Sequence, residues 1–404
     1  MSILATDTSH RNAGYATRPS NGETRMNTFR SHRLSNGAAL VALAFFLGTA
    51  AGSAAADSRA AQGTPGHLGK VTTLASLTHD TGEAPKAGLI LANDGNFYGV
   101  TTSGGAGGNG TVIRVTPSGA TTALYSFPRG GRRYTPLDPL VQGSDGALYG
   151  VETSRDFNTS VIFRLTLDGQ FSELQSFDDT FPSSLTLGRD GHLYGTTVFG
   201  GAHGVGELFR MSNTGGLKVI ASLDSSTPNA AQGAPLEGDD GNFYFGAAGG
   251  GSHGFGGLLQ VSPDGTVTTL YEFTGTGPIS GRPTGPLAYD AAHEYLWGET
   301  VDTGEASEVV VFRYKAGAVE DIGSLSYLNA GPVALGPDGV HFYVNSRTNV
   351  YSFAPGEGGR KVAVLPGKAD GNERLIFNPA GSMFGTTIDG GTDDGGTIFK
   401  VKGF

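Results

Sequence analysis

One short phrase recurs along the chain at a nearly constant interval, and this recurrence restricts the fold more than any other feature. It reads DGNFYGVTTSGG at its first occurrence. Looser copies extend the series, and the aligned turns begin at Asp94, Asp145, Asp190, Asp240, Asp290, Asp338 and Ala380. A period of about 50 residues is typical of propeller-type arrays, whereas helical repeats are shorter.

Each unit contains four short apolar runs separated by turn residues. In the first unit the runs cover 88–92, 96–102, 111–116 and 120–127. Asn-Asp-Gly joins the first pair and Pro-Ser-Gly joins the last pair, and glycine tolerates the positive φ of tight hairpin turns. No segment shows a sustained helical period. The sequence therefore predicts an all-β fold, a seven-bladed β-propeller with four antiparallel strands in each blade.

The two ends of the array indicate how the ring closes. The seventh unit stops after its third strand, GTIFKVKGF. Residues 69–77, GKVTTLASL, match the fourth strand of other units, such as GTVTTLYEF at 265–273. We therefore expect the N-terminal strand to complete the last blade, a closure that leaves no open edge.

Residues 26–56 have the layout of a cleavable secretory signal. Arg30 and Arg33 precede an apolar run, and three alanines stand before Asp57. The alternative is a membrane anchor, but the run of about ten apolar residues is shorter than the 20 or so that a span needs.

These features predict the domain organisation. We expect residues 1–56 to be an N-terminal extension and signal peptide, with Met26 as the true start. Residues 57–66 would be a linker, and residues 67–404 a single propeller. The mature protein would be exported to the periplasm or the extracellular space, with no membrane association after cleavage.

Composition excludes several classes of function. The formal net charge is -10, and an acidic body is a poor partner for nucleic acid. The chain has no cysteine, which excludes thiolate metal sites and cysteine nucleophiles. No motif for a cofactor is present, so we expect none, and we expect a monomer.

Two loops between units contain basic residues that could bind an acidic ligand. Arg129, Arg132 and Arg133 precede Tyr134 in the loop 128–139, and Arg282 lies in the loop 274–286. Guanidinium groups suit a carboxylate or an acidic sugar, so Arg132, Arg133 and Arg282 are candidate ligand-binding residues and Tyr134 a candidate catalytic one. The alternative is a solvated loop whose arginines pair with neighbouring acids.

The loops between the second and third strands supply the other candidates. His203 and His253 hold the same loop position in adjacent units, so they could act as an acid/base pair or as metal ligands. Asp393 and Asp394 could bind calcium together with Asp80 or Glu83. The alternative is that all of these are ordinary surface residues of glycine-rich loops, and no metal-binding motif is present.

The repeated unit resembles the bacterial tandem-repeat family called GloVer. The resemblance covers about residues 67–404 and depends on the DGNFYG turn, the glycine-rich loop and the fourth-strand pattern. It implies an exported protein. Members often end in surface-anchoring tails, and because no such tail follows IFKVKGF we do not expect surface attachment. The family brings no established activity and no catalytic residues.

Two functions are therefore compatible with the sequence. The first is an exported binding or interaction module, with a carbohydrate or an extracellular protein as partner. The second is an enzyme acting on acidic polysaccharide, a lyase or a glycoside hydrolase. In that enzyme arginine would neutralise a uronate, and tyrosine or histidine would move protons. Either site would lie on the loop face at the mouth of the channel.

Overall fold

A computed structural model of the chain describes residues 68–404 except 129–133, 137, 155–158, 292, 302–307, 326–330 and 370–372. The predicted signal peptide and the linker up to residue 66 lie outside the described residues, so these boundaries stay predictions. Among the described residues there is no helix, and hence none long and apolar enough to cross a membrane.

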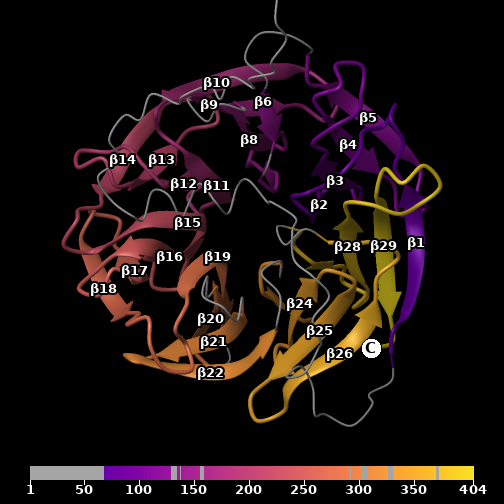
Figure 1. Cartoon of the computed structure of the whole chain (residues 1–404). Coiled ribbons are helices and arrows are strands. Elements are labelled where there is room, and N and C mark those ends of the chain that lie inside the picture. The colour runs from indigo at the N-terminus through magenta and orange to yellow at the C-terminus, as the bar shows by residue number, and fades with distance from the viewer. Residues whose placement is uncertain are drawn as a thin grey trace, which may run out of the picture. The chain divides into compact units, whose positions relative to one another are not determined.

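The strands form seven antiparallel sheets around a ring, which confirms the predicted seven-bladed propeller (Figure 1). Blade 1 contains β2 (Leu89–Leu91), β3 (Phe97–Val100), β4 (Thr111–Val115) and β5 (Thr121–Ser126); blade 2 contains β6 (Tyr134–Pro136), β7 (Val141–Gln142), β8 (Leu148–Ser154), β9 (Thr159–Leu165) and β10 (Phe171–Asp178); blade 3 contains β11 (Pro182–Leu187), β12 (Leu193–Thr197), β13 (Glu207–Met211) and β14 (Leu217–Ser222). 

The remaining blades follow the same order from the inner to the outer strand. Blade 4 contains β15 (Pro228–Glu237), β16 (Phe243–Gly250), β17 (Gly257–Val261) and β18 (Val267–Glu272); blade 5 contains β19 (Arg282–Asp290), β20 (Tyr295–Val301), β21 (Val309–Lys315) and β22 (Ala318–Leu325); blade 6 contains β23 (Ala334–Leu335), β24 (Phe342–Ser346), β25 (Asn349–Ala354) and β26 (Gly358–Val364); blade 7 contains β27 (Ile376–Phe377), β28 (Met383–Thr387), β29 (Thr397–Lys402) and β1 (Lys70–Ser76).

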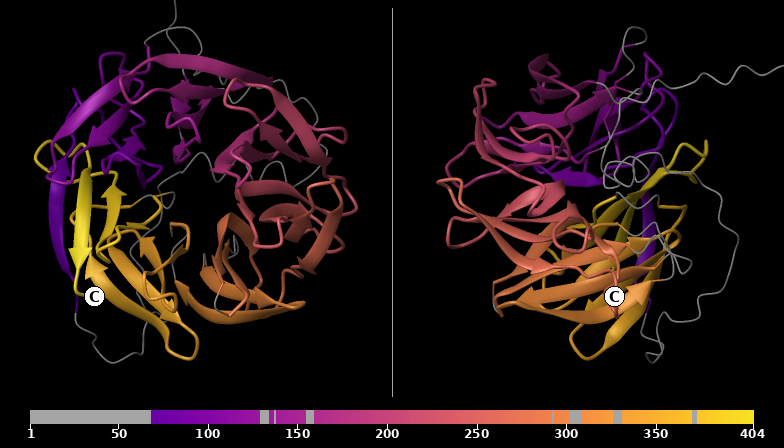
Figure 2. Two further views of the ribbon diagram at one scale, coloured as in Figure 1. Left: turned by 180° about the vertical axis from the view of Figure 1, so that it is seen from behind. Right: turned by 60° about the vertical axis from the view of Figure 1, so that its left-hand side comes forward.

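The N-terminal strand closes the ring as predicted. β1 pairs antiparallel with β29, and its register runs from Lys70 opposite Lys402 to Ser76 opposite Thr397. The indigo and yellow ends of the described chain therefore lie side by side in one blade (Figures 1 and 2). Because the two ends share a sheet, the array has no unpaired terminal blade.

The repeated phrase builds a hydrogen-bonded turn between the first and second strands of a blade. In blade 2, Asp145 Oδ1 accepts from the backbone N–H of Ala147 at 3.1 Å, and Oδ2 accepts from the Tyr149 hydroxyl at 2.9 Å. Arg164 of the third strand donates to the same Oδ2 at 2.8 Å. Aspartate–tyrosine bonds of 2.7 to 3.0 Å recur in three further blades, at Asp94–Tyr98, Asp190–Tyr194 and Asp240–Tyr244.

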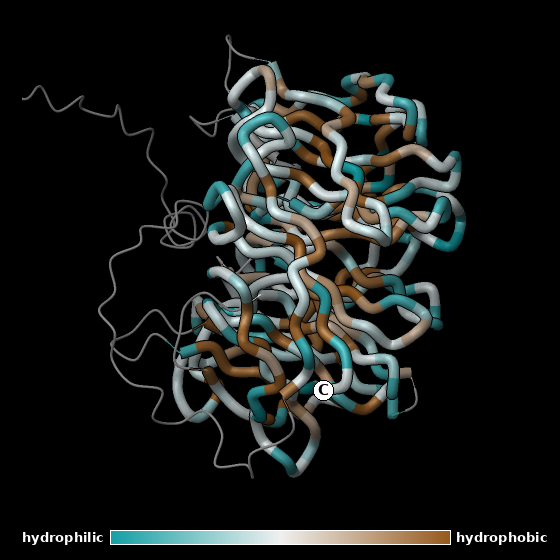
Figure 3. The backbone as a smooth tube through the Cα atoms, turned by 90° about the vertical axis from the view of Figure 1, so that its right-hand side faces the viewer, coloured by the Kyte–Doolittle hydropathy of each residue, from teal (hydrophilic) through white to brown (hydrophobic). Residues whose placement is uncertain are grey.

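The core lies between adjacent blades, where the aromatic residue of the second strand contacts the next sheet. Trp297 of blade 5 stacks on Phe342 of blade 6 with ring centroids 3.7 Å apart, and Tyr194 of blade 3 stacks on Phe243 of blade 4 at 4.2 Å. Apolar residues follow the strands, while hydrophilic ones gather at peripheral turns (Figure 3). The repeated phrase thus specifies the shape of each blade rather than its chemistry.

Candidate binding site in the central channel

The inner strands of all seven blades surround a cavity of about 720 Å³. A leucine fixes the register of five of these strands, because it packs where the glycine of the neighbouring second strand leaves room. For example, Leu140 Cδ2 lies 2.9 Å from the position that a Cβ on Gly150 would take, and Leu287 Cδ2 lies 2.7 Å from that on Gly298. The corresponding leucines of the other three strands are Leu89, Leu185 and Leu375.

The register of the leucines divides the channel wall into two levels, one formed by the residues after the leucines and one by the residues before them. The residues directly after the leucines line the cavity and are mostly apolar; they are Ile90, Val141, Thr186, Ala288 and Ile376. The two positions before the leucine are more polar, and they include Asp138, Ser184 and Arg374, which all line the cavity. Asp138, Ser184 and Arg374 therefore lie at one level of the channel, next to a mostly apolar level.

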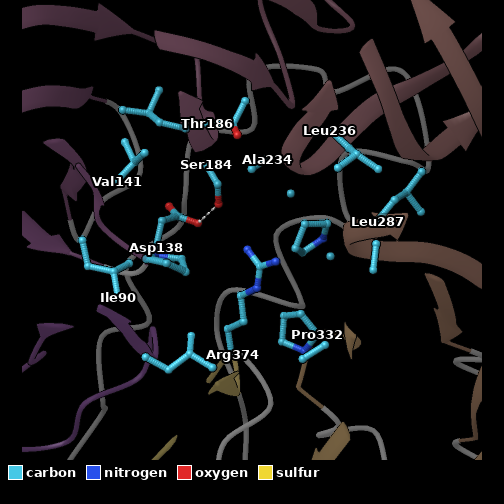
Figure 4. A pocket seen from close by; sticks show the side chains of 18 of the residues that line it. Ile90, Asp138, Val141, Ser184, Thr186, Ala234, Leu236, Leu287, Pro332 and Arg374 are labelled. Carbon is cyan, nitrogen blue, oxygen red and sulfur yellow. Dashed lines mark hydrogen bonds between the residues drawn. The ribbon is translucent and has the colours of Figure 1, made fainter. Parts of the chain in front are cut away.

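Asp138 and Ser184 face the cavity from blades 2 and 3. The Ser184 hydroxyl donates to Asp138 Oδ1 at 2.9 Å (Figure 4). Burial within the ring raises the pKa of the Asp138 carboxyl to about 7, although the hydrogen bond from Ser184 acts in the opposite direction. This carboxyl therefore changes its charge near neutral pH.

Arg374 of blade 7 extends into the cavity toward Asp138 and Ser184 (Figure 4). Its side chain is exposed to the channel space, yet protein surrounds it, and this desolvation lowers the pKa of its guanidinium. Within the described part of the chain, no carboxylate or carbonyl pairs with this guanidinium. An arginine carries five N–H donors, so these donors are available to a ligand.

The sequence-predicted residues that the structure describes lie away from the cavity, and the others are not described. Arg129, Arg132 and Arg133 lie outside the described residues, and Tyr134 is described only as backbone in β6. His203 and His253 are exposed on the equivalent loops of blades 3 and 4. None of the described candidates lines the channel cavity.

Arg282 is held by structural contacts. Its Nη1 donates to the backbone carbonyl of Ala248 at 2.6 Å and to that of Gly254 at 2.7 Å. Its guanidinium also lies 5.0 Å from the ring centroid of Phe255. These contacts join the start of β19 to β16 and to the loop 250–256 of blade 4, so they use part of the donor capacity that a ligand would need.

Asp394 has a local role in its loop. Its φ is 55°, a conformation that Gly204 and Gly254 supply at the equivalent positions of blades 3 and 4. Its Oδ1 accepts a hydrogen bond from the backbone N–H of Gly390 at 2.8 Å, which stabilises the turn. Among the described residues no group of three or more histidine or acidic side chains could hold a metal ion. A calcium site at Asp393 and Asp394 remains a prediction.

The chain belongs to the Gloeobacter/Verrucomicrobia repeat family, whose model matches residues 44–183 and 181–331. The resemblance seen in the sequence is thereby confirmed. No curated protein matches the chain.

Solved structures share the fold at low sequence identity. An oligogalacturonate lyase in complex with manganese has a TM-score of 0.55 and 13% identity, over 85% of this chain and 94% of that chain. A gluconolactonase from Xanthomonas campestris has a TM-score of 0.43 and 14% identity, over 86% of this chain and 98% of that one. These similarities concern the fold and assign no activity.

Proposed function

We propose that this protein is an exported binding module that takes a small acidic carbohydrate into its central channel. The observation that supports the proposal is the guanidinium of Arg374, which faces the cavity without a partner among the described residues. A guanidinium fork matches the geometry of a carboxylate, and the pair is strengthened where water is largely excluded.

The rest of the wall suits the remainder of such a ligand. Asp138 and Ser184 offer hydrogen-bond partners for hydroxyl groups, and the buried Gln232 Nε2 has no partner in the described part of the chain. The neighbouring apolar level of the wall, formed by the residues directly after the leucines, can contact the C–H groups of a sugar ring. A cavity of about 720 Å³ falls within the usual range for small-molecule sites.

One observation favours a polysaccharide-active enzyme, a lyase or glycoside hydrolase, as the second candidate. Asp138 has a pKa of about 7, which suits proton transfer at neutral pH. In this alternative Asp138 would move the proton and Arg374 would hold the carboxylate of an acidic sugar. The fold is also shared with an oligogalacturonate lyase, an analogy of fold alone.

Calorimetric titration of the purified protein with galacturonate, gluconate and galactose tests the proposal. We expect the two acids to bind and neutral galactose to bind more weakly. Arg374→Gln should weaken binding of the acids at least about tenfold, because a charge-assisted pair contributes roughly 1.5–3 kcal/mol. The control is Arg189→Gln, since Arg189 pairs with Asp239 on the surface.

Equal binding of the acids to Arg374→Gln and to the wild type would contradict the channel site. The enzyme alternative is tested in the same samples by incubation with oligogalacturonate. Release of unsaturated or reducing-end product that disappears in Asp138→Asn would favour the enzyme over the binding module.

A further inference from the structure

Glu299 departs from the pattern of the repeat at a position next to the channel. Two residues after the second-strand aromatic, the side chain faces the next blade near the inner strand. The residues at this position in blades 1 to 7 are Val100, Val151, Thr196, Gly246, Glu299, Asn345 and Thr386.

The two threonines at this position bond to the next blade, whereas Asn345 of blade 6, like Glu299, is buried with no partner for its side-chain amide among the described residues. Thr196 donates to the carbonyl of Gly233 in the next blade at 3.0 Å, and Thr386 donates to that of Pro85 at 3.4 Å. Glu299 is only 5% exposed, and its Oε2 is buried without a partner in the described part of the chain. A buried carboxyl oxygen without a hydrogen bond is costly, so this arrangement requires an explanation.

Glu299 does not itself line the cavity, but a glycine of the channel wall lies next to its carboxyl. Glu299 Oε1 lies 3.3 Å from the position that a Cβ on Gly285 would occupy, and Cγ of Pro332 lies 3.8 Å from the same position. Gly285 and Pro332 both line the cavity. Gly285 has the same position relative to Leu287 that Asp138 has relative to Leu140. Blade 5 therefore presents a gap where blade 2 presents a carboxylate.

A second buried polar atom near the gap also has no hydrogen-bond partner among the described residues. Thr284 is the cross-strand partner of Glu299 in the pairing of β19 with β20, and its buried Oγ1 has no partner among the described residues. Pro332 belongs to blade 6, which stands between the gap in blade 5 and Arg374 in blade 7, and both Pro332 and Arg374 line the cavity. The gap and the guanidinium are thus on the same side of the ring.

We propose that the gap at Gly285 is a subsite in which Glu299 binds a hydroxyl group of the acidic ligand whose carboxylate pairs with Arg374. The inference rests on the proposed function, because it needs the ligand to be in the channel. Burial raises the pKa of the Glu299 carboxyl well above its usual range, which favours its protonated form. A protonated carboxyl both donates and accepts, and so does a hydroxyl group.

The test compares two acids in calorimetric titrations of the whole protein. Galacturonate carries hydroxyl groups, whereas cyclohexanecarboxylate has a similar ring and none. Glu299→Leu should weaken galacturonate about tenfold, because hydrogen-bonding sites discriminate strongly against a lost partner. It should leave cyclohexanecarboxylate unchanged. Glu299→Gln keeps a donor and an acceptor at this position. This variant should therefore bind galacturonate within about threefold of the wild-type affinity.

The outcomes separate the subsite from the proposed function. If Arg374→Gln weakens both acids but Glu299→Leu weakens neither, the subsite is wrong and the channel site stands. If Arg374→Gln changes neither acid, the proposed function itself fails. Tighter binding of glucosamine than of galacturonate, lost in Glu299→Gln, would show that Glu299 binds an ammonium group as a carboxylate and would overturn the hydroxyl assignment.

Folding of the variants does not limit the test. Glu299→Leu replaces a desolvated carboxyl by an apolar group of similar size, so the protein should fold at least as well as the wild type. Should this variant fail to fold, galacturonate binding is compared between Glu299→Gln and Gly285→Ala instead. The added methyl group narrows the gap, and the positive φ of 67° at Gly285 makes a modest loss of stability expected. Unchanged galacturonate binding in folded Gly285→Ala would contradict the subsite.

Discussion

At the scale of single residues, buried carboxyl groups determine how stability responds to pH. Burial raises the pKa of Glu152 to about 8, with a further contribution from the charge of Glu173, and it raises the pKa of Glu207 in the same direction. The folded state therefore holds protons that the unfolded chain releases at lower pH. Such a group contributes stability below its unfolded pKa, and this contribution is lost as the pH rises through its folded pKa.

Glu152→Gln should flatten this pH dependence. At pH 4 the variant and the wild type should have similar free energies of unfolding, whereas at pH 8 the variant should be more stable by roughly 4 kcal/mol. Urea unfolding at a series of pH values measures the difference. Glu173→Gln is the control, because Glu173 is exposed and should shift the profile only slightly. A variant with the pH profile of the wild type would contradict the burial of an uncharged Glu152.

The tyrosine hydroxyl group of the repeated phrase should make a measurable contribution to the free energy of unfolding. Tyr149→Phe removes the donor to Asp145 and should cost about 1 kcal/mol. Tyr343 is its counterpart in blade 6, where the Tyr343 hydroxyl has no hydrogen bond within the described part of the chain and His341 pairs with Asp338 instead. Tyr343→Phe should therefore lower the Tm less than Tyr149→Phe does. Equal losses in the two variants would show that the hydrogen bond is not what the tyrosine contributes.

At the scale of strands, ring closure depends on β1. It pairs with β29 from Lys70 to Ser76 except for a bulge at Leu74, and the position of a Cβ on Gly69 lies only 2.6 Å from Cγ1 of Val401, so the two strands meet closely at their far end. The sequence predicts this closure because β1 copies the fourth-strand pattern and the seventh unit lacks one. Local pattern is sufficient here, since a strand and its turns are specified by neighbouring residues.

Truncation tests the closure. A chain that begins at residue 78 lacks β1 and exposes the edge of β29, so we expect a large drop in Tm and a tendency to associate. A chain that begins at residue 68 keeps β1 and should retain the Tm of the full chain. Differential scanning calorimetry and gel filtration of both chains provide the measurement. A stable monomer without β1 would contradict the role assigned to that strand.

At the scale of the whole molecule, the candidate site could not be predicted from the sequence in the way that the blades were. Asp138 and Arg374 are more than 200 residues apart, and only the closed ring brings both to one cavity. The sequence does contain a signal for this site. Asp138 and Arg374 are charged, whereas most other residues at the two positions before an inner-strand leucine are small or apolar. The arginines and histidines of the loops are visible in the sequence without knowledge of register, so the sequence points to the loops instead.

The proposed channel site depends on a contact between Arg374 and an acidic ligand. A crystal structure of the protein soaked with galacturonate would show whether this contact forms. We expect density in the channel, with the carboxylate within hydrogen-bond distance of the Arg374 guanidinium and a hydroxyl group directed at the gap beside Gly285. Galacturonate bound on the loop face near His203 and His253, with the channel holding water alone, would contradict it.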